Sequence, residues 1–282
     1  MADDYDATAD AWSSYGAAQD ALRGCHEAIM AAGAKRIAYI GDAILIEGDC
    51  LAVLPTLGRV DACVSDPPYG MSLDTDNSRF SGGDASSVSR RGSGKGTANG
   101  RPIINDDKPF DPVPFLSFDH VTLFGSNHFG ARLPVGTTLV WLKRLDGGFG
   151  SFLSDAEMAW EKGGHGVYCF RDTSLTAETR HRAHPTQKPL PLMRWCIERH
   201  GPEARTILDP FMGSGTTGVA ALQLGRKFIG IEIDPGYFDI ACKRIEEAWK
   251  QPRLFEEPRK KPEPAPTLFD GAGLPSDQKA GN

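Results

Sequence analysis

Residues 206–222, TILDPFMGSGTTGVAAL, decide the fold of this chain. An apolar strand pattern over residues 206–208 runs into a glycine-rich turn, and a helical pattern begins at Val219. Strand, glycine turn and helix together form the nucleotide-binding half of a doubly wound sheet. The sequence therefore predicts an α/β protein with a Rossmann-like, mostly parallel sheet.

The glycine turn is compatible with more than one cofactor. Residues 213–218, GSGTTG, satisfy the dinucleotide pattern G-x-G-x-x-G, so a nicotinamide dehydrogenase is one alternative. Asp209 at the strand tip opposes it, because a carboxylate in a partly dry site repels a pyrophosphate. S-adenosylmethionine has no phosphate, and its sulfonium and ammonium groups would be attracted to Asp209. No lysine follows the turn, which disfavours a P-loop.

An acidic residue also ends the next predicted strand, residues 227–231. Glu232 follows Asp209 by 23 residues, where dinucleotide sites place the carboxylate that binds a ribose diol. An adenosyl cofactor offers the same diol. The alternative is a solvated carboxylate at a strand end.

The tetrapeptide Asp66-Pro67-Pro68-Tyr69 follows an apolar strand pattern at residues 60–65. Two prolines remove two backbone donors and stiffen the chain. The result is a rim of acceptors beside the flat face of Tyr69. Such a rim suits a planar base with an exocyclic amino group, although an ordinary Pro-Pro turn with a packed tyrosine is the alternative.

A third box, residues 184–190 (HPTQKPL), precedes the glycine turn. With these boxes the chain resembles bacterial and phage DNA amino-methyltransferases of the N-4/N-6 DNA methylase family. It is similar to the permuted subgroup, in which the catalytic box precedes the cofactor box. The resemblance covers roughly residues 36–250, and residues 47–51 (EGDCL) and 229–234 match as well.

The resemblance implies a site-specific DNA methyltransferase that uses S-adenosylmethionine and acts on a flipped-out base. It favours adenine, because an aspartate stands directly before Pro67, while the serine form acts mostly on cytosine; cytosine amino-methylation remains the alternative. The implied catalytic residues are Asp66, Pro67, Pro68 and Tyr69. The implied cofactor residues are Asp49 at the adenine, Thr186 and Lys188 at the methionine end, Asp209, Phe211, Gly213, Gly215 and Thr216 around the pocket, and Glu232 at the ribose.

Two of these roles have structural alternatives. Asp49 could be the N-cap of a helical turn at residues 50–54. Lys188 could be a solvated surface lysine. Methylation of RNA, and a DNA-binding module without turnover, are further alternatives to the function itself.

The net charge of −6 is unusual for a partner of double-stranded DNA, but the charge is unevenly distributed. Residues 77–105 and 171–199 are both basic overall, and phosphate contact requires only a local positive patch. Residues 81–101, of which 11 are Gly or Ser, predict a flexible basic loop, and residues 171–183 a target-reading segment. Solvated loops are the alternative. The candidate DNA contacts are Arg90, Arg91, Lys95, Arg180 and Arg182.

Composition predicts a globular cytoplasmic protein: 282 residues, 40% hydrophobic and 24% charged, with no membrane-spanning run and an acidic first segment unlike a signal peptide. Six cysteines lack zinc-site spacing, so we expect reduced thiols and no metal. The expected organisation is a helical extension (1–35), a methyltransferase domain (36–250) and a disordered tail (251–282).

Other patterns complete the expected topology. Strands are expected at residues 44–47, 61–65, 120–124, 137–142 and 166–170, helices at 190–200 and 237–249, and a helix or packed turn at 156–160. The N-terminal helix could pack on the core or mediate a homodimer. In the tail, Gln251, Leu254 and Phe255 resemble a peptide that docks on sliding clamps; packing of Leu254 and Phe255 on the last helix is the alternative.

Overall fold

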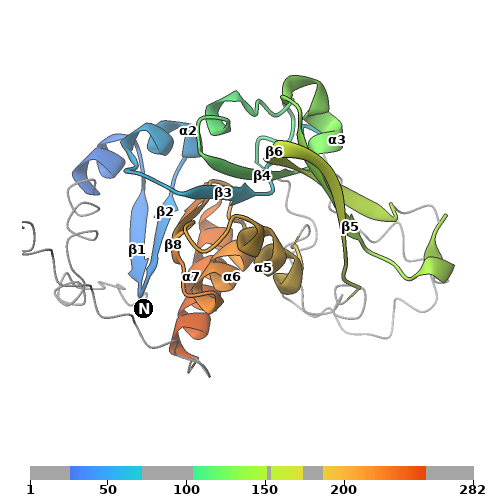
Figure 1. Cartoon of the computed structure of the whole chain (residues 1–282). Coiled ribbons are helices and arrows are strands. Elements are labelled where there is room, and N and C mark those ends of the chain that lie inside the picture. Colours follow the sequence, from blue (N-terminus) through green and yellow to red (C-terminus); the bar gives the residue numbers. More distant parts are fainter. Residues whose placement is uncertain (1–25, 72–103, 151–153, 174–186, 252–282) are drawn as a thin grey trace, which may run out of the picture. The chain divides into compact units, whose positions relative to one another are not determined.

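One eight-stranded mixed sheet forms the centre of the described protein (Figure 1). The computed structural model describes residues 26–71, 104–150, 154–173 and 187–251, all within one compact unit, Met1–Gln251. The strands are β1 (Arg36–Ile40), β2 (Ala43–Glu47), β3 (Ala62–Ser65), β4 (His120–Phe124), β5 (Gly136–Leu142), β6 (Ala156–Arg171), β7 (Thr206–Asp209) and β8 (Lys227–Glu232). The labelled α-helices are α2 (Cys50–Val53), α3 (Ser126–Phe129), α5 (Leu190–Arg199), α6 (Thr216–Gln223) and α7 (Pro235–Lys250).

The strand order is β1-β2-β8-β7-β3-β4-β6-β5. The five strands β2, β8, β7, β3 and β4 are parallel to one another, and β1 is antiparallel to β2. Because both faces of a parallel sheet are covered, its strands are continuous apolar runs, and every residue of β2 and β3 is buried. The predicted fold class, α/β with a Rossmann-like and mostly parallel sheet, is confirmed.

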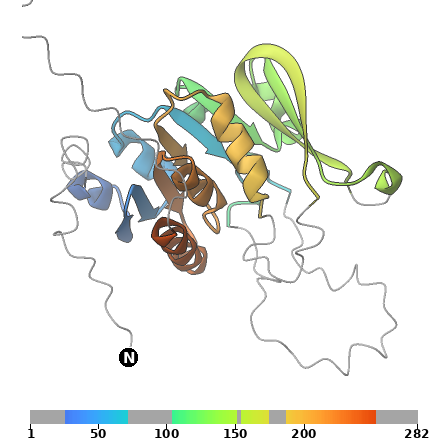
Figure 2. The ribbon, with the colours of Figure 1, turned by 60° about the horizontal axis from the view of Figure 1, so that its bottom comes forward.

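Helices cover the sheet on both faces (Figures 1 and 2). Successive side chains of a strand point to opposite faces, so Leu45 packs in one apolar core while Ile44 and Ile46 pack in the other. The first core includes residues of α5, α6 and α7, and the second includes residues of α2 and α3. The sheet is thereby held rigidly from both sides, and its strand ends are fixed in place.

Most expected elements agree with the observed ones to within two residues, but the prediction of a helix or packed turn at residues 156–160 was wrong. Ala, Glu and Met have high helix propensity. Tertiary pairing overrides it here, because this segment lies between β4 and β5 and hydrogen-bonds to both. The strand expected at residues 166–170 is the second part of the same long strand, β6.

The strand β6 has two arms that pair with opposite edges of β5. Leu139 lies opposite both Ala159 and Tyr168. The first arm is antiparallel to β5, because Gly136 pairs with Lys162 and Leu142 with Ala156. The second arm is parallel to β5, because Thr138 pairs with Val167 and Leu142 with Arg171. The first arm is also antiparallel to β4, so its first residues, from Ala156, lie beside the carboxyl end of β4.

The start of the described chain differs from the predicted topology in one strand and shows where part of the predicted N-terminal helix packs. The strand β1 was not predicted; it forms a hairpin with β2 through Gly41 and Asp42. Residues 26–31 are helical, and Ile29 is buried in the second core, so this part of the N-terminal segment packs on the domain. A homodimer contact by the N-terminal helix stays a prediction.

Candidate active site

The predicted catalytic and cofactor boxes lie at the carboxyl ends of neighbouring parallel strands. Asp66 follows β3, Asp209 ends β7, and Glu232 ends β8. From β3 the chain continues outward to β4, and it later returns to form β7 on the other side of β3. Such a reversal of strand order opens a crevice at the strand ends, where ligands of open α/β sheets bind.

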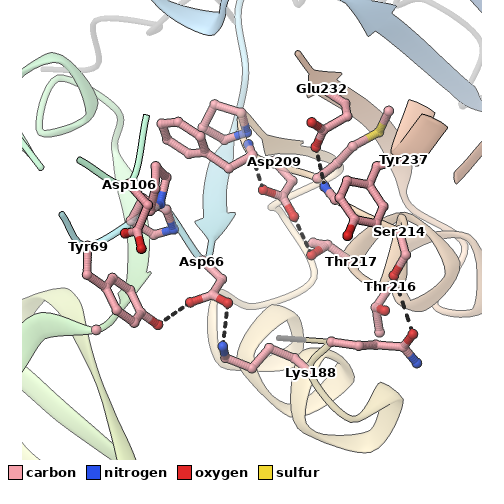
Figure 3. A pocket seen from close by; sticks show the side chains of 18 of the residues that line it. Asp66, Tyr69, Asp106, Lys188, Asp209, Ser214, Thr216, Thr217, Glu232 and Tyr237 are labelled. Atoms are coloured by element: carbon pink, nitrogen blue, oxygen red, sulfur yellow. Dashed lines mark hydrogen bonds and ion pairs between the residues drawn. The ribbon is translucent and has the colours of Figure 1, made fainter. Parts of the chain in front are cut away.

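A single cavity of about 610 Å³ joins the two boxes (Figure 3). Asp66 and Tyr69 line it together with Asp209, Gly213 and Glu232. Pro67, Pro68, Asp49, Lys188, Phe211 and Thr216 also line it. No solid protein separates the double-proline rim from the glycine turn.

Asp209 is buried and fully engaged by its neighbours. Its carboxylate accepts hydrogen bonds from the hydroxyls of Ser65 and Thr217, both at 2.5 Å, and from the Phe211 amide at 3.1 Å. Burial raises the pKa of Asp209 to about 6 despite these donors. Because Ser65 is the neighbour of Asp66, one hydrogen bond connects the catalytic box to the cofactor box.

Glu232 holds the glycine turn from the adjacent strand. Its two carboxylate oxygens accept from the backbone amides of Gly213 and Asp234, each at 2.8 Å. Burial raises the pKa of Glu232 to about 7. Each oxygen keeps a second lone pair, so the carboxylate can still accept from a ligand diol.

Gly215 is the one predicted cofactor residue within the described ranges that does not line the cavity. Its Cα faces α7, and an added Cβ would lie 3.0 Å from the Cβ of Ala241. It also has φ +79°, a conformation that favours glycine. This glycine allows the turn and the close approach of α6 and α7, and its role in shaping the cofactor pocket stays a prediction.

The turn is also held from α7. The Arg244 guanidinium donates to the Ser214 carbonyl at 2.5 Å and to the hydroxyls of Ser214 and Thr216 at 2.8 and 3.2 Å. Thr216 lines the cavity as predicted. Arg244 has no recognisable signal in the sequence, because it lies outside every motif.

Asp66 lies between a phenol and an ammonium group (Figure 3). The Tyr69 hydroxyl donates to one of its oxygens and Lys188 Nζ to the other. The Tyr69 ring stacks on His128 with centroids 4.9 Å apart, and its edge lies against Gly125. Burial raises the pKa of Asp66, although Lys188 and Tyr69 act to lower it.

Asp106 fixes the chain directly after the double-proline rim. Its carboxylate accepts from the amides of Gly70 and Met71 at 2.9 and 3.2 Å. Asp106 is 5% exposed and lines the cavity. Sequence reasoning missed it, because only the fold brings it beside residues 66–71.

Lys188 is 6% exposed, which excludes the solvated alternative. It was expected at the methionine end of the cofactor, but its ammonium contacts Asp66 and lies 3.1 Å from Glu157 Oε2. Lys143 donates to the other Glu157 oxygen at 3.0 Å. Glu157, also missed by sequence reasoning, belongs to the segment that was expected to be helical.

Asp49 is the N-cap of α2, and its side chain accepts from the Leu51 amide at 2.9 Å. The structural alternative is therefore confirmed, and the same residue also lines the cavity. Several predicted residues lie outside the described ranges: Thr186, Arg90, Arg91, Lys95, Arg180 and Arg182. So do residues 81–101, most of the segment 171–183 and the tail after Gln251.

The described residues include neither a metal centre nor a membrane-spanning helix. No group of three or more His, Cys, Asp or Glu side chains there is arranged to hold a metal ion. Among the helices of the described ranges, none combines the length and apolarity that a bilayer span requires.

The strand order, the carboxyl-end crevice and the glycine turn define a Rossmann-like α/β fold with a ligand site at its strand ends. Within that class, residues 136–243 match the model of one family, described as DNA methylase. The resemblance to bacterial DNA amino-methyltransferases is thereby confirmed. The matched segment includes the glycine turn and Glu232 but begins after Asp66, so the permuted order of the boxes stays a prediction.

Curated relatives share short, highly similar stretches with this chain. The chain is 56% identical over 75 residues to the type II methyltransferase M2.DpnII of Streptococcus pneumoniae, which is 26% of this chain and 28% of that protein. It is 40% identical over 88 residues to M.HinfI of Haemophilus influenzae, which is 31% of this chain and 24% of that protein. The chain thus matches about a quarter of the length of these relatives.

Solved structures give weaker similarities. A complex of M1.HpyAVI with SAM is 22% identical, covers 71% of this chain and 98% of that chain, and has a TM-score of 0.45. The cytosine-N4-specific PvuII DNA methyltransferase is 15% identical, covers 74% and 92%, and has a TM-score of 0.44. The fold assignment rests on the strand order described above.

Proposed function

We propose that this protein is an S-adenosylmethionine-dependent DNA methyltransferase that methylates the exocyclic amino group of a flipped-out adenine. The single observation that carries the proposal is the cavity shared by Asp66 and Tyr69 on one side and by Asp209 and Glu232 on the other. One half suits a planar amino-bearing base, and the other suits a cationic, diol-bearing nucleoside. The matched family and its relatives support the same chemistry.

The cofactor half fits S-adenosylmethionine better than a dinucleotide. The cavity wall at the glycine turn carries two carboxylates, Asp209 and Glu232, which attract a cation and repel a pyrophosphate. Glu232 would accept from the ribose hydroxyls, and Gly213 allows close backbone approach. Bound S-adenosylmethionine would supply an electrophilic methyl group on a sulfonium. The S–C bond would break as the N–C bond forms, S-adenosylhomocysteine would be left, and the amino nitrogen would lose one proton.

The other half would present the nucleophile. An amino nitrogen inside a duplex is paired and out of reach, so the nucleotide must be flipped out, at a cost of a few kcal/mol. Stacking on Tyr69 would return about 1–3 kcal/mol. Asp66 and the Pro67 carbonyl would accept the amino hydrogens, which favours a more tetrahedral nitrogen with its lone pair aimed at the methyl group.

The aspartate directly before Pro67 favours adenine over cytosine, and methylation of the cytosine amino group is the competing outcome. The test is to incubate the purified chain with double-stranded DNA and isotopically labelled S-adenosylmethionine, then analyse the nucleosides by mass spectrometry. Labelled N6-methyladenine would support the proposal. Labelled N4-methylcytosine would show that the substrate is cytosine instead of adenine. Cofactor-dependent DNA binding without any methylated nucleoside would show that the protein is a DNA-binding module without turnover.

Cofactor affinity should depend on pH through Glu232. Its pKa of about 7 in the free protein means that it is largely protonated at pH 6, and a protonated carboxyl is a poorer acceptor for the ribose diol. Binding favours the ionised form, so affinity rises with pH and is about tenfold weaker at pH 6 than above pH 8. Isothermal titration calorimetry at pH 6, 7 and 8, in buffers of different ionisation enthalpy, would also detect the released proton.

The Glu232→Gln variant is the control for this pH dependence. It keeps the size of the side chain and cannot titrate, so its weaker binding should vary much less between pH 7 and 8. Asp209, whose pKa is about 6, accounts for the remaining slope at lower pH. Equal wild-type affinity at pH 6 and pH 8 would exclude Glu232 as a ligand of the diol.

Partners are part of the same proposal. Double-stranded DNA would be held by the basic stretches at residues 77–105 and 171–199, with base flipping into the cavity, in the cytoplasm of a bacterial or phage-infected cell. The type II names of the relatives support a role in restriction-modification. We also propose that the tail docks on a sliding clamp through Gln251, Leu254 and Phe255. A peptide of residues 248–258 that does not bind purified clamp would refute this docking.

A further inference from the structure

A buried charge network lies beside the proposed catalytic carboxylate. Asp66 and Glu157 are the two acids, Lys188 lies between them, and Lys143 donates to the far oxygen of Glu157 at 3.0 Å. The four groups come from separate parts of the chain: the turn after β3, the first arm of β6, the segment before α5 and the end of β5. Two positive and two negative charges balance one another in this network.

Lys188 has little freedom to leave this position. Its side chain is 6% exposed, and its ammonium also lies 5.3 Å from the centre of the Phe124 ring on β4. A buried ammonium is stable only when it is paired. Of its two partners, Asp66 is the residue that must turn to an entering amino group, so Glu157 is the one that can keep Lys188 in place throughout.

Glu157 is placed for this purpose. One oxygen is bonded to Lys143, and the other, Oε2, lies 3.1 Å from Lys188 Nζ without a well-aligned hydrogen bond among the described residues. It can therefore bind the ammonium more closely when Asp66 accepts from the substrate. Burial acts to raise the pKa of Glu157, but Lys188 and Lys143 outweigh burial and lower it to about 2, so Glu157 remains charged.

We infer that Lys188 and Glu157 form a positioning pair for Asp66: Lys188 holds the Asp66 carboxylate ionised and oriented toward the target amino group, and Glu157 holds Lys188. Neither residue needs to contact the transferred methyl group. This inference rests on the proposed function, since it assigns Asp66 to the amino group of the base. It moves Lys188 from the cofactor to the catalytic carboxylate and adds Glu157 to the site.

The charges that face Asp66 determine the expected pH response. Lys188 attracts a carboxylate charge there, whereas Glu157 and Asp209 repel it, and the Tyr69 hydroxyl donates to it. Removing the ammonium in Lys188→Met should raise the pKa of Asp66 and move the acid limb of kcat to higher pH. Glu157→Gln removes the repulsion of Glu157 and leaves Asp66 as the one described carboxylate that pairs with the buried ammonium, so the same limb should move to lower pH. The double variant should lie between the two.

The matched control is Glu161→Gln. Glu161 lies on the same arm of β6 and is also in a partly buried ion pair, but its partner Arg199 is bonded at 2.6 Å outside the cavity. This variant should lose stability without moving the acid limb. Glu157→Gln keeps the Oε1 acceptor for Lys143, so it tests the inference even if Lys188→Met does not fold. Lys188→Arg, which keeps the charge, should retain the wild-type limb.

A second measurement does not depend on turnover. Carbon-13 NMR of aspartate-labelled protein, with the Asp66 carboxyl assigned by its absence in Asp66→Asn, gives the titration of Asp66 directly. Opposite shifts in the Lys188 and Glu157 variants support the positioning pair. Shifts in the same direction, or none, overturn it whatever the enzyme assay shows. A wild-type protein that transfers no methyl group would refute the proposed function. The NMR titration would still show whether Lys188 and Glu157 control the ionisation of Asp66.

Discussion

Asp66→Ala is expected to lower kcat for DNA methylation at least about 100-fold, the usual cost of removing one preorganised hydrogen-bonding group from a transition state. The dissociation constant for S-adenosylmethionine should stay unchanged, because the described residues that donate to the Asp66 carboxylate are Tyr69 and Lys188, and neither belongs to the glycine turn or to the end of β8. The variant should fold, since Lys188 keeps Glu157 at 3.1 Å and no buried cation is left alone. Single-turnover kinetics and calorimetric titration measure the two quantities.

Asp66→Asn is the matched comparison. It keeps the size of the side chain and one acceptor oxygen, so its rate should fall between those of the wild type and Asp66→Ala. A variant without the carboxylate that methylates DNA at nearly the wild-type rate would remove Asp66 from the mechanism. A large loss of cofactor affinity in the same variant would instead place Asp66 in the cofactor site.

Gly125→Ala should weaken binding of the flipped base by about 1–3 kcal/mol, the value of one base–aromatic stack. An added Cβ at this position would overlap the Tyr69 ring, and the positive φ of +74° is unfavourable for alanine. The ring must therefore move, and it takes its hydroxyl away from Asp66. Binding of DNA that carries a fluorescent base analogue at the target position measures the loss, and thermal unfolding reports the strain.

Gly130→Ala serves as the control for that substitution. Gly130 directly follows α3, has a helical φ of −55°, and has open space around its Cα. It should bind target DNA like the wild type. Equal binding by the Gly125 and Gly130 variants would show that the position of Tyr69 does not matter for base capture. Tyr69→Ala should reproduce the effect of Gly125→Ala on DNA while leaving cofactor affinity intact.

The sequence revealed the sheet and the main acids of the site because these depend on local patterns. Apolar runs such as residues 44–46 mark strands that are covered on both faces, and the parallel arrangement brings their ends to one edge. Asp66, Asp209 and Glu232 each directly end or follow such a run. Their convergence on one cavity therefore follows from topology alone.

The remaining site residues could not be predicted, because their positions depend on long-range contacts. Glu157 faces Lys188 only because strand pairing overrides the helix propensity of its segment. Asp106 reaches Gly70 across 36 residues of chain. Gly215 shows the same limit: the local pattern placed it beside the pocket, but its contact with α7 could be seen only in the folded structure.

The hydrogen bond from Ser65 to Asp209 joins residues that are 144 positions apart in the chain. The shared cavity requires that two adjacent parallel strands, β3 and β7, end at the same border of the sheet, whichever of them comes first in the chain. A rearranged gene that encoded the same segments in another order could therefore form the same cavity, provided that these two strands still paired.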